Sequence, residues 1–238
     1  MKKTVILNHK MFLTLDEAKA LKSKMDSLDF GGLNLIVCPS YINFGVFKGY
    51  TLGAQDCFYE DRGAYTGFIS SYQLSLLGVK YSMVGHYERR CCDTDDTINK
   101  KIRSLLKNCM TPILCIGETK EQNEMKRTSE VIKSQLKKAL RGISFDNSDE
   151  LFVAYEPSFL IGGKHALNQN DIDDIISYIK KVLIDLKVPN FKVLYGASID
   201  NKTIDYIKNS NADGFLIGSS SVKYDELKHI VDCINSVK

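Results

Sequence analysis

The sequence lacks two features that would direct it to a membrane or to nucleic acid. No apolar run among its 238 residues approaches the length of a membrane-spanning helix. Its charge is nearly balanced, with 32 basic residues against 29 acidic ones, so neither kind of partner is expected. Residues 1–7 resemble the start of a signal peptide, but their apolar part stops at Asn8, too soon for the hydrophobic region of such a signal. We therefore expect a cytoplasmic protein.

The sequence also lacks paired cysteine spacing. Its seven cysteines form no C-x-x-C, the spacing typical of zinc knuckles and redox pairs. Cys91 and Cys92 are adjacent, and adjacent cysteines rarely bridge each other. Cys38 and Cys115 lie in apolar runs, where a thiol packs as a small hydrophobic group. These features predict reduced thiols, as in a reducing compartment.

No Pro/Gly/Ser-rich linker and no low-complexity segment interrupts the chain, so we expect one domain over residues 1–238. Strands that are buried on both faces read as continuous apolar runs. Eight such runs recur, at 4–7, 33–38, 51–54, 81–84, 113–116, 151–155, 191–195 and 214–217. Helical patterns fall between most of them. This alternation in a chain of about 240 residues predicts an α/β fold, a single (β/α)8 barrel rather than an open sheet.

The predicted helices carry recognisable start signals. Residues 14–17 read T-L-D-E, a capping box that predicts a helix from this point. Apolar periodicity predicts further helices at 129–140, 170–186 and 225–237. Asn168 or Asn170 is a candidate cap for the second of these three.

Polar side chains follow several of the apolar runs. Asn8 and Lys10 follow the first run, His86 the fourth and Glu156 the sixth. The carboxyl ends of barrel strands share one face, so we expect these side chains to meet there. Glu156 is followed by Pro157 and a loop with two glycines, an arrangement that suits a general base beside a closing loop. On this fragment alone, a solvated acid at a strand end is the alternative.

Small residues follow the last two runs, as G-A-S at 196–198 and G-S-S-S at 218–221. They let backbone N–H groups approach an anion closely. In barrels of this kind a phosphate commonly lies at the loops after strands seven and eight. The segment 55–67 is longer and more polar than the other loops, and a long loop in a compact domain is usually functional.

A set of motifs resembles those of the triosephosphate isomerase family, in the same order and at compatible spacings. The motifs are N-x-K (8–10), G-A-Q (53–55), G-A-Y-T-G (63–67), V-G-H-Y-E-R-R (84–90), C-I-G-E-T (115–119), A-Y-E-P (154–157), L-Y-G-A-S (194–198) and D-G-F-L-I-G-S (213–219). Each alone is weak, but together they span nearly the whole chain.

The resemblance implies an enzyme that interconverts glyceraldehyde 3-phosphate and dihydroxyacetone phosphate, in glycolysis and gluconeogenesis, without metal or organic cofactor. Glu156 would carry the proton between the two carbons, and His86 would donate a hydrogen bond to the carbonyl oxygen. Lys10, with Asn8 beside it, would stabilise the negative charge of the enediolate. The phosphate would be held by backbone N–H groups at Gly162, Ser198, Gly218 and Ser219.

The resemblance also implies two roles for loops. Loop 157–166 would close over the substrate, and loop 55–67 would form a homodimer by placing Thr66 beside Lys10 of the partner subunit. His9 would point away from the site along an extended chain. Glu88 would hold the geometry of the site through ionic contacts.

Several residues depart from the family pattern. Tyr87 stands where the family has serine, and Phe159 stands where it has tryptophan. Ala197 and Ser219 each replace a glycine, which would strain a position with positive φ. The closing loop is one residue shorter than usual, before Gly163. Two alternatives therefore stay open: an isomerase of a four-carbon sugar phosphate, and a barrel that binds a phosphorylated ligand with little turnover.

Overall fold

The computed structural model describes residues 2–162 and 166–237. Its strands are β1 (Thr4–Asn8), β2 (Asn34–Cys38), β3 (Gly53–Ala54), β4 (Tyr81–Val84), β5 (Thr111–Ile116), β6 (Leu151–Tyr155), β7 (Phe191–Tyr195) and β8 (Gly214–Ile217). They form one eight-stranded parallel sheet in the order β2-β1-β8-β7-β6-β5-β4-β3. The expectation of a (β/α)8 barrel is confirmed, and each strand falls on one of the eight apolar runs.

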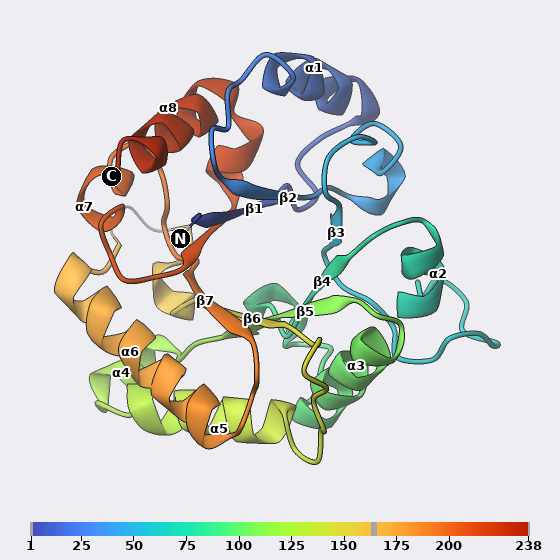
Figure 1. Ribbon diagram of the computed structural model, residues 1–238, viewed down its shortest axis with the longest axis vertical. Helices are drawn as coiled ribbons and strands as arrows, with labels where there is room; N and C mark the ends of the chain where they lie inside the picture. Colours follow the sequence, from blue (N-terminus) through green and yellow to red (C-terminus); the bar gives the residue numbers. More distant parts are fainter. Residues whose placement is uncertain (1, 163–165, 238) are drawn as a thin grey trace.

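The two ends of this sheet meet between β2 and β3, so the barrel is nearly closed (Figure 1). The Val37 amide donates to the Thr51 carbonyl over 2.9 Å, and Val37 forms an isolated bridge with Leu52. β3 is shorter than the predicted run 51–54, because its paired residues begin at Gly53, while Leu52 forms only an isolated bridge with Val37.

The strands alternate between two apolar environments. In β1, Ile6 points into the barrel, where it packs with other inward side chains. Val5 and Leu7 point outward, into the larger core between the strands and the helices. The inward cluster consists of Ile6, Ile36, Cys38, Met83, Ile113, Cys115, Phe152, Ala154, Leu194 and Leu216. Both faces of each strand are thus buried, which is why the sequence shows continuous apolar runs.

Helices surround the barrel (Figure 1). They are α1 (Leu15–Met25), α2 (Ser71–Leu76), α3 (Asp95–Lys107), α4 (Lys120–Glu124), α5 (Thr128–Ala139), α6 (Gln169–Asp185), α7 (Ile204–Ile207) and α8 (Tyr224–Asn235). The capping box that begins α1 is present, with Thr14 and Glu17 exchanging hydrogen bonds, and such a cap contributes about 1 kcal/mol. Asn168 caps α6, as the sequence indicated.

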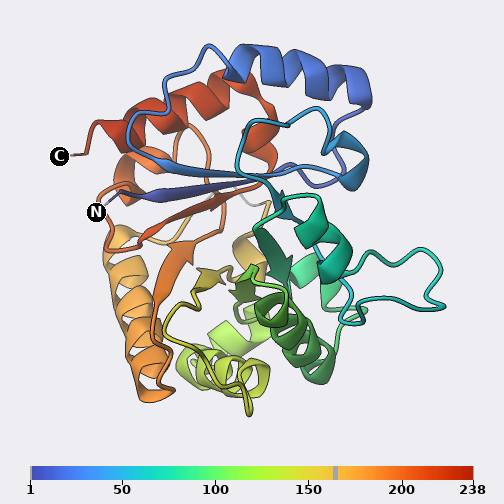
Figure 2. The same ribbon diagram turned by 45° about the vertical axis from the view of Figure 1, so that its right-hand side comes forward.

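The loop between β3 and α2 extends away from the barrel (Figure 2). Its side chains from Arg62 to Phe68 are exposed. The base of the loop is held by an aromatic cluster in which Phe58 lies 4.8 Å from Tyr65 and 4.3 Å from Phe68, between ring centroids. The loop therefore presents a projecting surface on a fixed base.

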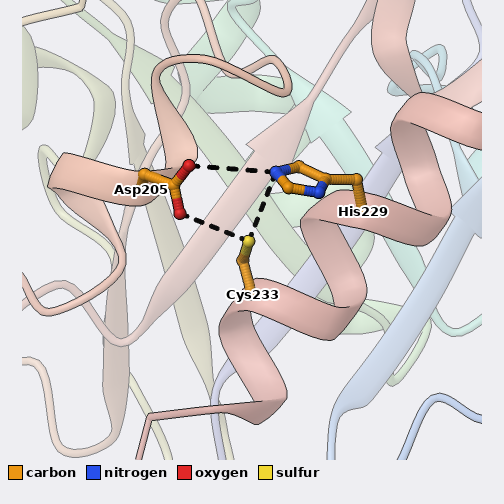
Figure 3. A group of neighbouring side chains, drawn as sticks. All are labelled: Asp205, His229 and Cys233. Carbon is orange, nitrogen blue, oxygen red and sulfur yellow. Dashed lines mark hydrogen bonds and ion pairs between the residues drawn. The ribbon is translucent and has the colours of Figure 1, made fainter.

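α7 and α8 pack against each other at the end of the chain. Asp205 of α7 faces His229 and Cys233 of α8, and the three polar side chains converge (Figure 3). No helix in the described residues has the length and apolarity that a membrane crossing requires.

Candidate active site

A cavity of about 330 Å³ opens at the carboxyl end of the strands. All the residues to which the sequence assigned a catalytic or binding role line it: Asn8, Lys10, His86, Glu156, Gly162, Ser198, Gly218 and Ser219. Tyr87, Glu88 and Gly196 also line it. The structure thus brings together residues from the first, fourth, sixth, seventh and eighth β–α connections. Their roles remain predictions.

Glu156 is the most buried charged group in this cavity, with 4% of its surface exposed. Burial raises the pKa of its carboxyl, and the nearby Lys10 charge only partly opposes this. Oε2 has no hydrogen-bond partner among the described residues, and Oε1 lies 3.6 Å from His86 Nε2. A buried carboxylate with a free oxygen is a stronger base than one in water, because little in its surroundings compensates the charge.

The backbone around Glu156 is held tightly. Its amide donates to the Ile116 carbonyl over 2.7 Å. A Cβ on Gly117 would lie 2.0 Å from the Glu156 carbonyl oxygen, so no larger residue fits there without moving the backbone. The glycine in the C-I-G-E-T motif therefore allows β5 and β6 to converge at the base of the cavity.

His86 is fixed in one tautomer by its own turn. Its Nδ1 accepts a hydrogen bond from the Glu88 amide over 3.3 Å. A ring nitrogen that accepts an N–H carries no proton, so the proton of the neutral ring lies on Nε2. Nε2 is the atom that faces Glu156 across 3.6 Å, too far for a good hydrogen bond. An N–H donor and a carboxylate therefore line the same part of the cavity without being paired to each other.

Lys10 is positioned by a chain of contacts. Its amide donates to Asn8 Oδ1 over 3.1 Å, and its ammonium lies 2.7 Å from Glu88 Oε1. The Tyr87 hydroxyl donates to the same Glu88 oxygen over 3.0 Å, and the Tyr87 ring centroid lies 5.4 Å from the ammonium. Burial raises the pKa of Glu88, but the charge and hydrogen bond of Lys10 outweigh it, so the pKa is lowered overall. Glu88 is therefore held ionised, and the expected ionic role of this residue fits the geometry.

Two residues of the site have a left-handed backbone conformation that is not explained by the end of a helix. Five described non-glycine residues have positive φ. Cys109, Lys126 and Lys187 follow the ends of α3, α4 and α6, where a left-handed residue commonly terminates a helix. Lys10 and Ser198 have φ of 47° and line the cavity instead. Such strain costs about 1–3 kcal/mol and tends to occur at functional sites.

The small residues after β7 and β8 form a compact edge of the cavity. The Ser198 carbonyl accepts a hydrogen bond from Thr203 Oγ1 over 2.7 Å, and the Gly218 carbonyl accepts one from the Ser221 amide over 2.9 Å. Neither Ala197 nor Ser219 has positive φ. The strain that their replacement of glycine would cause does not arise, because the left-handed conformation falls on Ser198.

The loop after β6 is connected to this edge. The Ser198 hydroxyl donates to the Leu160 carbonyl, and Ser158 begins a single turn of 3₁₀ helix. Gly162 has a φ of 72°, which favours glycine. Residues 163–165, which include part of the predicted closing loop and the site of its missing residue, lie outside the described residues.

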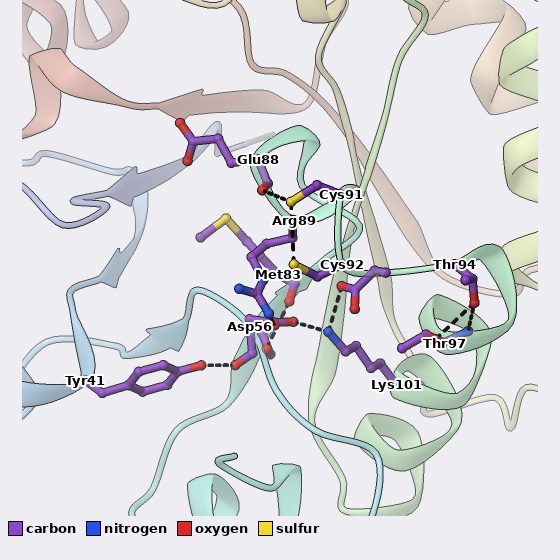
Figure 4. A network of polar contacts seen from close by, with 12 residues as sticks. Tyr41, Asp56, Met83, Glu88, Arg89, Cys91, Cys92, Thr94, Thr97 and Lys101 are labelled. Atoms are coloured by element: carbon purple, nitrogen blue, oxygen red, sulfur yellow. Dashed lines mark hydrogen bonds and ion pairs between the residues drawn. The ribbon is translucent and has the colours of Figure 1, made fainter. Parts of the chain in front are cut away.

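A network of ion pairs anchors the loop after β4 (Figure 4). Arg89 Nη2 lies 3.0 Å from Asp56 Oδ2, and Lys101 Nζ lies 2.7 Å from both Asp56 Oδ1 and Asp93 Oδ2. Lys101 is 2% exposed, so the two carboxylates compensate a charge that water does not reach. The network fixes the loop to the start of loop 55–67. The sequence did not predict this network, because its members come from three separate segments.

His9 lies outside the cavity, as expected from its place between Asn8 and Lys10. It is 1% exposed and packs edge-on against Phe47, with ring centroids 4.9 Å apart. Neither ring nitrogen has a hydrogen-bond partner among the described residues, and burial lowers the pKa to about 4. Cys38 and Cys115 are buried, as predicted, and all seven cysteines are free.

A (β/α)8 barrel that gathers a buried carboxylate, an imidazole and a lysine at the carboxyl ends of its strands has the arrangement of an acid–base enzyme. The sequence matches the model of the triosephosphate isomerase family over residues 3–234. The match covers nearly the whole chain, so the protein belongs to the triosephosphate isomerase family and is an isomerase.

Proposed function

We propose that the protein interconverts glyceraldehyde 3-phosphate and dihydroxyacetone phosphate through an enediolate. The observation that carries this proposal is that a buried carboxylate and an N–H donor face each other in one cavity without a hydrogen bond between them. Glu156 and His86 Nε2 lie 3.6 Å apart in one cavity. An aldose–ketose isomerisation needs both groups at adjacent atoms of the substrate, a base at carbon and a donor at oxygen.

Each step follows from the surroundings of one group. Glu156 removes a proton from the carbon beside the carbonyl, and its raised pKa strengthens it as a base. His86 Nε2–H donates to the carbonyl oxygen, where negative charge develops. The Lys10 ammonium stabilises the negative charge of the enediolate and also contacts the phosphate of the substrate. Glu156 then returns the proton to the neighbouring carbon while His86 carries the hydroxyl proton from one substrate oxygen to the other, so that no net oxidation occurs.

The phosphate is held by backbone N–H groups at the edge formed by the last two β–α loops. These groups belong to Gly162, Ser198, Gly218 and Ser219, with Asn8 orienting Lys10 nearby. The cavity of about 330 Å³ suits a small anion. This reaction is a step of glycolysis and gluconeogenesis, in which the protein would act in the cytoplasm.

Tyr87 favours the three-carbon substrate over the four-carbon alternative. Its ring occupies the cavity beside Lys10, where the family's serine would leave space. The test is a comparison of kcat/KM for glyceraldehyde 3-phosphate and for a four-carbon ketose phosphate. We expect the triose to be preferred by about tenfold or more, and Tyr87→Ser to reduce that preference. Equal or better turnover of the tetrose would contradict the assignment, and the absence of either turnover would favour a binding protein.

We also propose a homodimer formed through loop 55–67. A second cavity of about 340 Å³ adjoins the first and shares Asn8, Lys10, His86 and Glu88 with it. It has the position required to receive the projecting loop of another copy, with Thr66 beside Lys10 of the partner subunit. Sedimentation should show a dimer, and shortening residues 62–67 should yield monomers of low activity. A fully active monomer would defeat this proposal.

A further inference from the structure

The side chains of Asp205, His229 and Cys233 converge on the side of the barrel formed by α7 and α8 (Figure 3). His229 and Cys233 are one helical turn apart on α8, and Asp205 reaches them from α7. Cys233 Sγ lies 3.4 Å from His229 Nε2 and 3.5 Å from Asp205 Oδ1. His229 Nε2 lies 3.9 Å from Asp205 Oδ2. None of the three lines the catalytic cavity.

The arrangement is unsuited to nucleophilic catalysis. In a thiol–imidazole–carboxylate relay, the thiol and the carboxylate contact opposite nitrogens of the ring. Here both contact the same nitrogen, Nε2 of His229. The carboxylate therefore cannot orient the ring while the ring accepts the thiol proton. Three ligand atoms that face one point are instead the geometry of a metal site.

The separations agree with a tetrahedral metal ion. Zinc bonds of about 2.3 Å to sulfur, 2.0–2.1 Å to nitrogen and 2.0–2.2 Å to oxygen place S and N about 3.6 Å apart. They place S and O about 3.6 Å apart, and N and O about 3.4 Å apart. The observed sulfur distances of 3.4 and 3.5 Å are close to these values. The nitrogen lies 3.9 Å from the other Asp205 oxygen, Oδ2, so a rotation of the exposed carboxylate is needed to bring one oxygen within reach of the same ion as both other ligands.

We propose that Asp205, His229 and Cys233 bind one divalent metal ion of the zinc type, with water in the fourth position. A thiolate, an imidazole and a carboxylate form a donor set of intermediate softness, which favours zinc over magnesium or calcium. The isomerisation does not use this ion. Its structural effect is to join α7 to α8, the helices that follow the two loops at the phosphate edge.

One group opposes the ion and gives the proposal a sharp test. Lys208 Nζ lies 3.3 Å from Asp205 Oδ1, in the same short helical segment. The ammonium competes with a cation for this oxygen and also repels it. Removing the Lys208 charge should therefore tighten metal binding. If the cluster were only a structural salt bridge, the same change would remove a stabilising contact and would not create a metal site.

The experiment titrates the purified full-length protein with Co²⁺ and with Zn²⁺ alone. We expect one ion per chain, with a thiolate-to-cobalt charge-transfer band and the intense visible bands of tetrahedral cobalt. Cys233→Ser should abolish the charge-transfer band and weaken Zn²⁺ binding at least about tenfold, since even the loss of a group that supports a ligand costs this much. His229→Gln should weaken binding similarly. Lys208→Met should tighten it severalfold. Isomerase activity, measured without metal, should be unchanged in these variants. Unchanged activity shows that the variants fold.

The matched control is Cys92→Ser, which removes another exposed thiol that lies close to a second sulfur, 3.5 Å away in Cys91. This variant should keep the wild-type cobalt spectrum. A band that persists in Cys233→Ser and disappears in Cys92→Ser would assign the metal to the adjacent cysteines and overturn the proposal. Absence of binding to the wild-type protein, or weaker binding in Lys208→Met, would overturn it as well.

Discussion

The end of β6 and the loop after β4 each place a carboxylate in the same cavity, Glu156 and Glu88. The surroundings of the two side chains shift their pKa values in opposite directions. Glu156 is 4% exposed, one of its oxygens has no partner among the residues that the structure describes, and burial raises its pKa. Glu88 is half-exposed, and its ion pair with Lys10 at 2.7 Å lowers its pKa. The same functional group is therefore suited to act as a base in one region and as a fixed counter-charge in the other.

The position of a carboxylate in the cavity therefore does not by itself define its role. A base must be able to take a proton, so it needs burial and a free oxygen. A counter-charge must stay ionised, so it needs a cation and access to water.

Glu156→Gln should lower kcat by about a thousandfold or more, because an amide cannot remove a proton from carbon. The same change should raise the melting temperature. A folded-state pKa above the unfolded value means that ionisation at neutral pH favours unfolding, so removing the buried charge stabilises the fold. Kinetics and thermal melts near pH 7 check both effects. Near-normal turnover would show that the base is elsewhere.

His86→Ala should slow turnover about a hundredfold or more, because it removes the donor to the developing oxyanion. Exchange of tritium from solvent into substrate should fall in parallel. His86→Gln is the control, since it retains an N–H donor and should recover part of the rate. Unchanged kinetics in the alanine variant would indicate a structural histidine.

The two buried histidines differ in hydrogen bonding. His86 accepts a hydrogen bond from the Glu88 amide, whereas His9 has no partner among the described residues. Its pKa of about 4 lies below the unfolded value of 6.5, so the unfolded state binds the proton more readily. Stability is therefore full above about pH 6.5 and falls as the pH drops toward 4. The loss between pH 7 and pH 5 should be about 2 kcal/mol. Urea unfolding of the wild type and of His9→Leu measures it, and an equal pH dependence in the two proteins would contradict the assignment.

Glu88→Gln should have the smallest effect, a loss of less than about tenfold in kcat/KM. The variant releases Lys10 from one contact, but Lys10 keeps the hydrogen bond of its amide to Asn8 Oδ1. Stability should fall slightly, because a half-exposed ion pair contributes little. That small contribution is present above the unfolded pKa and is lost in acid. A loss as large as that of Glu156→Gln would erase the distinction between the two carboxylates.

Much of the fold could be predicted because it depends on local patterns. The apolar runs marked all eight strands, and the caps at Thr14 and Asn168 marked two helix starts. The residues of the cavity could be foreseen because parallel barrel strands end on one face. The length of β3 could not, since it depends on how closely β2 approaches residues 51 and 52.

Features that depend on side chains from distant segments were not predictable. Lys101 reaches Asp56 across 45 residues, and no spacing rule connects them. Asp205 likewise meets Cys233 only because α7 packs on α8. The left-handed backbone at Ser198 was not predicted, because the family pattern names a residue type and not its φ.

The most direct test of the account follows the proton itself. Wild-type protein, Glu156→Gln and Glu88→Gln are each given glyceraldehyde 3-phosphate in heavy water, and deuterium on carbon is measured by NMR in product and remaining substrate. Binding of a phosphorylated enediolate mimic is measured in parallel. We expect deuterium incorporation by the wild type and by Glu88→Gln, and none by Glu156→Gln, although all three bind the mimic. Deuterium incorporation by Glu156→Gln at the wild-type rate, or its loss in Glu88→Gln, would contradict the central claim that burial makes Glu156 the base.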